Sequence, residues 1–489
     1  PTSEFVVNFL SEIIHCKENG GQFPNLERII LSPGCKISDK AMVSLHSIIQ
    51  KEWLMLTGVS LHVGDLSADN MKLLGDAINA APKLQSINFI FSQGSSCSPL
   101  QHLAETIRRS PQHQTIKLSL AGQHVSTNEL LVAAIRQVST LDKLAISEYI
   151  TDEAVTLLSE VIKHANALHS INLSFCDGSD SGMMRPSKVI KDAPSLRSIS
   201  LYFPDIYDGG MKLLSEAIQT KPALQSISIA LSEYGAISDD GMGHLSKAIQ
   251  CASALESISL DCQEISAAGM TLLIKAIQDA SALRNISLSC AEISDDGMKH
   301  LSKAIQNAPK LQSITIEPWR IAISDDDMGH LSKAIQHAPA LQSITIGLTP
   351  LNKEISYACM EHLSQAIQHA PKLQSISIRL SYGEFYAAGM KLWSEAIRTA
   401  SALQNISLTC GDFSNACMGH LSEVIQNAPA LQSISLNCQK IQDDVKKRLS
   451  EAIKIAPVTL SFKLQGFYGD QSLFAGLTNV SFEHYVPAF

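Results

Sequence analysis

Residues 293–316 read ISDDGMKHLSKAIQNAPKLQSITI, and the chain repeats this stretch with modest variation. Its last part alternates apolar and β-branched residues with polar ones, which is typical of a strand with one buried face. Its first part offers Ser294 or Asp295 as a helix cap. Apolar residues then follow at helical spacing: Met298, Leu301, Ala304 and Ile305. The stretch therefore predicts one helix followed by one strand.

The strand motif recurs 16 times, at intervals of 27 to 32 residues. Periods of this length indicate a solenoid. Because about one helix separates successive strands, the strands are expected to be parallel neighbours. Helices need ~8–10 Å each and paired strands ~4.8 Å, so strands should line the concave face and helices the convex face. The leading strand residues are Leu26, Leu56, Leu84, His113, Leu141, Leu168, Leu196, Leu224, Leu255, Leu283, Leu311, Leu341, Leu373, Leu403, Leu431 and Thr459.

The repeated unit resembles the 28-residue leucine-rich repeat of the ribonuclease-inhibitor subclass, from about Pro24 to Leu464. The resemblance implies an α/β horseshoe of about 16 repeats. The family usually has Asn or Cys at the ninth repeat position, whereas this chain has residues such as Gln263 and Ala291 there, with cysteine one place earlier. The residues of one unit that carry the likeness are Leu283, Ile286, Leu288, Ile293, Gly297, Leu301 and Ile305.

Three segments are predicted along the chain. Residues 1–25 should form an N-terminal capping helix, because residues 3–17 place their apolar side chains on one stripe. Residues 26–464 hold the leucine-rich repeats. Residues 465–489 are aromatic-rich and are expected to form a C-terminal cap over the last strand, whose edge would otherwise be exposed.

Composition argues against several classes of protein. The chain has 38 basic and 47 acidic residues, a net charge of −9, and no cluster of Lys and Arg, which disfavours nucleic acid as a partner. Its 11 cysteines include no C-x-x-C pair, so neither a disulfide framework nor a zinc ribbon is indicated, and a reducing cytosol is the expected location. No apolar run reaches the ~18 residues of a membrane span.

No catalytic motif, phosphate-binding loop or zinc-protease motif is present, so no enzyme activity, catalytic residue, cofactor or metal is predicted. Histidines recur just before the helix leucine, but equivalent positions on neighbouring helices are ~8–10 Å apart, too far to share a metal. Recurring cysteines, including Cys262, Cys290, Cys410 and Cys438, are expected to pack as small apolar residues. The ISDD acids are expected to cap helices.

Two surfaces compete as the binding site. The exposed strand residues are mostly Gln and Ser, including Gln312 and Gln374, and lack the side chains that usually anchor partners. Four units carry insertions after the strand, at residues 230–236, 317–322, 347–354 and 379–384. Such loops fall on one rim of a solenoid. The anchors expected on that rim are Tyr234, Trp319, Arg320 and Tyr382.

These observations predict a monomeric, non-enzymatic scaffold that binds a protein partner. Late repeats that are near copies of one another resemble those of repeat effectors that intracellular bacteria inject into host cells, which implies the host cytoplasm as the place of action. Two alternatives follow from the same family resemblance. One is a GTPase-activating protein of the Ran-GAP type, with Arg320 as its only candidate arginine. The other is an intracellular inhibitor of an enzyme.

Overall fold

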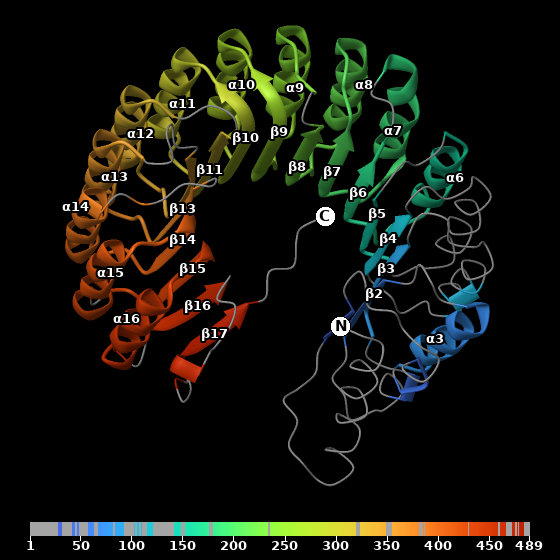
Figure 1. Ribbon diagram of the computed structural model, residues 1–489. Coiled ribbons are helices and arrows are strands. Elements are labelled where there is room, and N and C mark those ends of the chain that lie inside the picture. The colour runs from blue at the N-terminus through green and yellow to red at the C-terminus, as the bar shows by residue number, and fades with distance from the viewer. Residues whose placement is uncertain are drawn as a thin grey trace. The chain divides into compact units, whose positions relative to one another are not determined.

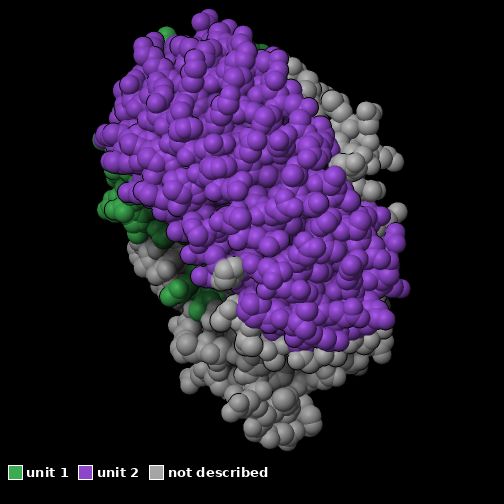
Figure 2. Space-filling view, turned by 90° about the vertical axis from the view of Figure 1, so that its left-hand side faces the viewer, with its two compact units in different colours: residues 1–229 green, residues 230–489 purple. Residues whose placement is uncertain are grey.

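The structure is a computed structural model of the chain. It describes residues 28–31, 42–44, 46–47, 57–62, 67–81, 84–91, 102, 105–106, 109, 115–120, 141–147, 152–175, 179–232, 235–318, 323–348, 355–380, 385, 387–428, 430–457, 460–465, 472–474, 477 and 479–483. The chain divides into two compact units, residues 1–229 and 230–489, which Figure 2 colours separately. Each unit is described by itself.

The first unit alternates strands with helices, and successive strands from β1 to β7 pair in parallel. Its strands are β1 (Arg28–Leu31), β2 (Gly58–His62), β3 (Ser86–Phe91), β4 (Thr115–Leu120), β5 (Lys143–Ser147), β6 (Ser170–Ser174) and β7 (Ser198–Phe203). Its described helices are α3 (Ala68–Ala80), α6 (Asp152–Ile162), α7 (Asp180–Asp192) and α8 (Asp208–Gln219). The division between the units falls within β8 (Ser226–Leu231).

The second unit continues the same alternation, with the strands on one side and the helices on the other (Figure 1). Its strands are β9 (Ser257–Ile265), β10 (Asn285–Ile293), β11 (Ser313–Pro318), β12 (Ser343–Leu348), β13 (Ser375–Leu380), β14 (Asn405–Asp412), β15 (Ser433–Lys440), β16 (Ser461–Gln465) and β17 (Val480–Glu483). Its helices are α9 (Asp239–Cys251), α10 (Ala267–Asp279), α11 (Asp295–Asn307), α12 (Asp325–His337), α13 (Tyr357–His369), α14 (Ala387–Thr399), α15 (Asn415–Asn427), α16 (Asp443–Lys454) and the short η2 (Ser472–Phe474).

The predicted register is confirmed throughout, because each of β1 to β16 begins two residues after the predicted leading residue. The strand pairings are parallel and match equivalent residues, for example Ile286 with Ile314 and Ile314 with Ile344. The core lies between sheet and helices. In α11 the four predicted core residues are at most 2% exposed, whereas Lys299 and Lys303 face outward. The chain is therefore a leucine-rich repeat solenoid, with one strand and one helix in each complete unit.

Two details differ from the sequence-based expectation. The insertions begin later than predicted, because Glu317, Gly347 and Arg379 still belong to strands, and Pro318 is a buried strand residue rather than part of a loop. The C-terminal segment also contains β17, which pairs in parallel with β16 through contacts such as Leu464 with Phe482. Strand β17 lacks the LxxI motif, so the repeat pattern in the sequence did not reveal this strand. The N-terminal helix predicted within residues 1–25 lies outside the described residues.

Candidate functional site

The candidate site is the edge of the second unit at which β11, β12 and β13 end. These three neighbouring strands precede three of the four predicted insertions. The strands have 6 residues each, whereas β9 and β10, which precede no insertion, extend to 9 residues. The insertions therefore replace the last strand residues of the plain repeat, and they begin side by side on the sheet.

An ion pair crosses these strand ends. A guanidinium nitrogen of Arg379 on β13 lies 2.5 Å from Oε1 of Glu317 on β11. Gly347 lies between them on β12, as the register partner of Arg379. A Cβ atom at Gly347 would lie 3.0 Å from the Cα atom of Glu317, which is tighter than ordinary contact. Glycine therefore leaves room for Glu317, whose carboxylate Arg379 reaches across the middle strand.

This ion pair is suited to positioning rather than to stabilising the chain. The Arg379 side chain is 55% exposed and that of Glu317 27% exposed. Partly exposed ion pairs contribute ~0–1 kcal/mol to stability. Because the pair joins the first and third of three adjacent strand ends, it fixes the spacing of the points from which the insertions leave. We call Glu317, Gly347 and Arg379 the rim clamp.

The inner face of the strands beside the clamp carries short hydroxyl side chains. They are half-buried and lie in register from strand to strand: Ser259, Ser287, Thr315, Thr345, Ser377, Ser407 and Ser435. The exception is Asp261 on β9, which carries a carboxyl group. Burial raises the pKa of this carboxyl, and a hydrogen bond with Ser289 opposes that rise. Such small side chains offer a partner little contact area, so this face is a weaker anchor than an aromatic loop.

The predicted floor residues Gln312 and Gln374 lie at the opposite edge, because each immediately precedes its strand. On β11 and β13, four strand residues separate each glutamine from the clamp residue of the same strand, a span of ~17 Å. Their backbone carbonyls fix the register. The carbonyl of Gln312 accepts from the N–H groups of Gln342 at 2.8 Å and Ser343 at 2.9 Å, and that of Gln374 accepts from the next strand in the same way. The structure therefore does not bring these glutamines together with the loops.

The predicted rim anchors Tyr234, Trp319, Arg320 and Tyr382 lie outside the described residues. Their positions in the chain still follow from their neighbours. Trp319 and Arg320 come directly after Pro318, the last residue of β11, and Tyr382 comes two residues after Leu380, the last residue of β13. Three of the four anchors therefore follow strands that the rim clamp joins.

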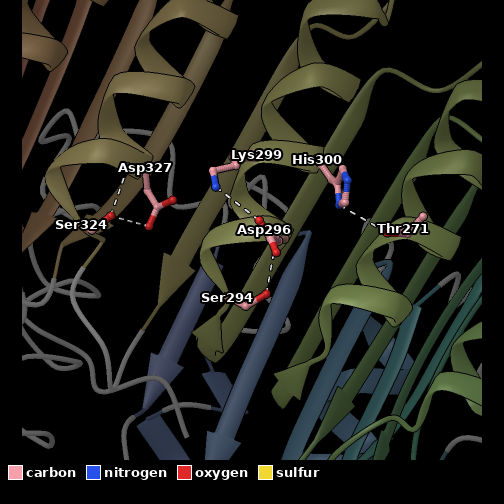
Figure 3. A network of polar contacts seen from close by, with 8 residues as sticks. Thr271, Ser294, Asp296, Lys299, His300, Ser324 and Asp327 are labelled. Atoms are coloured by element: carbon pink, nitrogen blue, oxygen red, sulfur yellow. Dashed lines mark hydrogen bonds and ion pairs between the residues drawn. The ribbon is translucent and has the colours of Figure 1, made fainter.

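The helix starts of the second unit were predicted to be capped by Ser or Asp, and serine is the cap of α9 to α13 and of α15. Ser294 accepts from the N–H of Gly297 at 3.2 Å, and Ser324 accepts from the N–H of Asp327 at 3.1 Å (Figure 3). The aspartates instead occupy the first helical turn. Two of them link neighbouring helices, because Asp239 accepts from Ser266, the cap of α10, and Asp325 accepts from Ser356, the cap of α13.

The histidine and cysteine columns have structural surroundings. The five recurring histidines are half-buried, and His300 contacts Thr271 at 3.3 Å (Figure 3). Sγ atoms of Cys262 and Cys290 lie 3.8 Å apart, and those of Cys410 and Cys438 3.3 Å apart, all in the core. Within the described ranges, no three His, Cys, Asp or Glu side chains gather in a way that could hold a metal ion. Besides His300, the five recurring histidines include His244, His330, His362 and His420.

Burial also affects the reactivity of the thiols. The neighbouring thiol of Cys262, together with burial, raises the pKa of Cys290. The pKa of Cys410 rises in the same way beside Cys438. Burial raises the pKa of Cys359 to about 12, with a contribution from the charge of Asp325. These thiols are protonated at neutral pH and are therefore poor nucleophiles.

Sequence analysis missed the rim clamp, although the signal was present. Glu317, Gly347 and Arg379 each stand six residues after a leading leucine, at Leu311, Leu341 and Leu373. Acid, glycine and base at equivalent positions of three consecutive units indicate an ion pair across a small residue. The strand pairing confirms the prediction that these units are spatial neighbours.

No protein-family model matches the chain, and no curated protein matches it. Solved structures do resemble it. One is TLR13 in a complex with ssRNA13, which is 13% identical to this chain with a TM-score of 0.37. The match covers 89% of this chain and 63% of TLR13, so this chain spans less than two thirds of that protein. Rad7 from a yeast Rad7 and Elc1 complex is 14% identical with a TM-score of 0.45, over 70% of this chain and 83% of the other.

A third structure is the leucine-rich repeat-containing protein LegL7 from Legionella pneumophila. It is 15% identical with a TM-score of 0.40, over 64% of this chain and 96% of that one. Identities of 13% to 15% concern the fold, and nothing about activity or partners follows from them. Among the described helices, none is long and apolar enough to cross a bilayer.

Proposed function

We propose that this chain is a non-enzymatic scaffold that binds a protein partner at the loop rim, defined as the insertions that follow β11, β12 and β13. The observation that carries the proposal is the rim clamp, in which Arg379 reaches Glu317 over Gly347. It holds the origins of three insertions at fixed spacing. A preorganised surface loses less entropy on binding than a mobile one.

The sequence of the loops gives this rim the side chains that binding needs. Trp and Arg are enriched among residues that dominate binding energy, and Trp319 and Arg320 leave β11 together. The inner strand face has mostly hydroxyl side chains and supplies secondary hydrogen bonds. We also propose that the protein acts in a reducing cytosol, that of a host cell if it is a bacterial effector. The seven described cysteines are all free thiols, which supports a reducing environment.

Finer assignments remain predictions. These are the ribonuclease-inhibitor subclass, the effector role, the role as an enzyme inhibitor, and GTPase activation. The last depends on Arg320, which lies outside the described residues. No specific observation favours these alternatives over the scaffold, so a single experiment on partner binding addresses all of them.

The experiment is affinity capture from eukaryotic lysate, with quantitative mass spectrometry, using three versions of the chain. The variant Trp319→Ala/Arg320→Ala removes the rim anchors, and Gln312→Ala/Gln374→Ala is the matched control at the other strand edge. We expect a protein that wild type and the glutamine variant retain and that the rim variant loses. Partners retained by the rim variant and lost by the glutamine variant would contradict binding at the rim.

A further inference from the structure

The first unit carries a tyrosine at a helix start where serine is usual. Ser179 caps α7 by accepting from the N–H of Gly182, and Ser238 caps α9 by accepting from that of Gly241. The corresponding residue of α8 is Tyr207, whose side chain makes no capping hydrogen bond and is 61% exposed. Aromatic residues are poor caps. The sequence therefore gives up a local stabilising contact at this position.

A carboxylate from the neighbouring helix compensates for the missing cap. Asp180, in the first turn of α7, lies against Gly209 at the start of α8, where a Cβ atom would be only 2.2 Å from Oδ2 of Asp180. A negative charge is favourable at a helix N-terminus. Asp180 supplies a negative charge at this helix start, as Asp208 of α8 itself does, but neither role requires a tyrosine at residue 207. Departures from local preference concentrate at functional sites.

A second exposed tyrosine, Tyr202, is the penultimate residue of β7, just before the connection to α8. Tyr202 projects from the exposed face of β7, next to Ser174 of β6, and is 38% exposed. The backbone at this point is held firmly, because the N–H of Phe175 donates to the carbonyl of Tyr202 at 2.9 Å. The ring of Phe175 stacks on that of Phe203 with centroids 5.2 Å apart.

The connection ends as firmly as it begins. Ile206 is only 6% exposed and anchors the residues between Pro204 and Tyr207 in the core. The N–H of Met211 then donates to the carbonyl of Tyr207 at 2.8 Å and begins the helix. The two exposed rings are therefore presented by an ordered backbone, which lowers the entropy lost when a partner binds.

The charges around the two rings favour a basic ligand. Asp180 and Asp205 are exposed, and residues 202–211 contain no Lys or Arg. The basic side chains Arg185 and Lys212 lie in the second turns of α7 and α8. Aromatic faces attract guanidinium and ammonium groups, and nearby carboxylates add to that attraction. We propose that Tyr202, Tyr207, Asp180 and Asp205 form a docking surface for an arginine-rich segment of a partner protein.

This docking surface is independent of the loop rim, because it lies wholly within residues 1–229. The test uses the full-length chain and a fluorescent probe peptide of alternating arginine and glycine, with binding followed by anisotropy. The comparison peptide has glutamine in place of arginine. We expect the arginine peptide to bind wild type, and the variant Tyr202→Ala/Tyr207→Ser to bind it at least about tenfold more weakly.

Two features of the design exclude trivial explanations. Tyr207→Ser restores the usual cap residue, so the melting temperature should not fall, and weaker binding cannot then be attributed to unfolding. Tyr357→Ala removes a 50% exposed tyrosine from the start of α13 and should change the affinity less than about twofold. Equal affinity for the glutamine peptide, or equal losses in the Tyr357 and Tyr202/Tyr207 variants, would overturn the proposal.

Discussion

Leu301 illustrates how a single residue holds one repeat to its neighbours. It is fully buried in α11, at the helix position that is leucine in most units. We expect Leu301→Ala to lower the free energy of unfolding by ~2–5 kcal/mol, because the lost apolar contacts leave a cavity. Urea denaturation measures this change. A loss below ~1 kcal/mol would show that the helix does not pack as described.

Asp327 is an acid at a position that is glycine or cysteine in the other described helices α9 to α15 of the second unit. It is only 4% exposed, and its Oδ1 atom has no hydrogen-bond partner. Burial raises the pKa of this carboxyl, and the charge of Asp295 raises it further. The hydrogen bond with Ser324 and the charge of His330 lower the pKa and offset part of that rise. The folded state therefore favours the protonated acid.

This shift predicts how stability depends on pH. The contribution of Asp327 is fully present below its ordinary pKa of 3.8 and is lost as the pH rises through the higher pKa of the folded state. We expect Asp327→Asn to raise the free energy of unfolding at neutral pH, by an amount that shrinks as the pH falls toward that value. Denaturation across this pH range tests it, with the exposed Asp326→Asn as control. A difference independent of pH would contradict the argument.

At the scale of elements, the start of α11 separates the role of serine from that of aspartate. Ser294 accepts the N–H of Gly297, whereas Asp296 contacts Lys299 at 3.3 Å on the exposed surface. We expect Ser294→Ala to lower the free energy of unfolding by ~0.5–2 kcal/mol. Asp296→Ala should change it by less than ~0.5 kcal/mol, apart from its small helix-dipole contribution. Equal losses in chemical denaturation would mean that the aspartate, not the serine, caps α11.

The thiol pairs of neighbouring strands allow a second test at this scale. Cys262 and Cys290 join β9 to β10, and Cys410 and Cys438 join β14 to β15, all at most 1% exposed. Burial should make all four react slowly with a thiol reagent in the native protein, and the raised pKa values of Cys290 and Cys410 add to this effect. Cys251 is exposed and serves as the internal reference. Mass spectrometry should find Cys251 labelled first and the pairs only after unfolding, whereas rapid native labelling of Cys290 or Cys410 would indicate a reactive site.

At the scale of the molecule, repetition made the fold predictable. An error in one unit is corrected by the others, so even His113 and Thr459 mark strands although neither is leucine. Where a feature occurs once, as in β17, the pattern gave no signal. The candidate site was predicted only in part. The sequence indicated where loops are inserted, but the ion pair between Glu317 and Arg379 depends on contacts over a whole intervening repeat.

The separation of the two predicted surfaces also needed the structure. Gln312 immediately precedes β11 and Trp319 immediately follows it in the sequence, so the six residues of this strand, ~20 Å long, separate the two positions along the chain. Because the glutamines precede their strands and the loop anchors follow them, a compact partner domain that contacts one set need not contact the other. This geometry turns two vague binding surfaces into alternatives that mutations can distinguish.

The most direct test is the dissociation constant of the captured partner, purified, for three forms of the chain: wild type, Trp319→Ala/Arg320→Ala and Gln312→Ala/Gln374→Ala. Binding at the loop rim predicts that the first variant weakens affinity by about 30-fold or more, which corresponds to ~2 kcal/mol. The glutamine variant should stay within about twofold of wild type. Unchanged affinity in the rim variant, together with a large loss in the glutamine variant, would place the partner at the other edge of the sheet and contradict the proposed function.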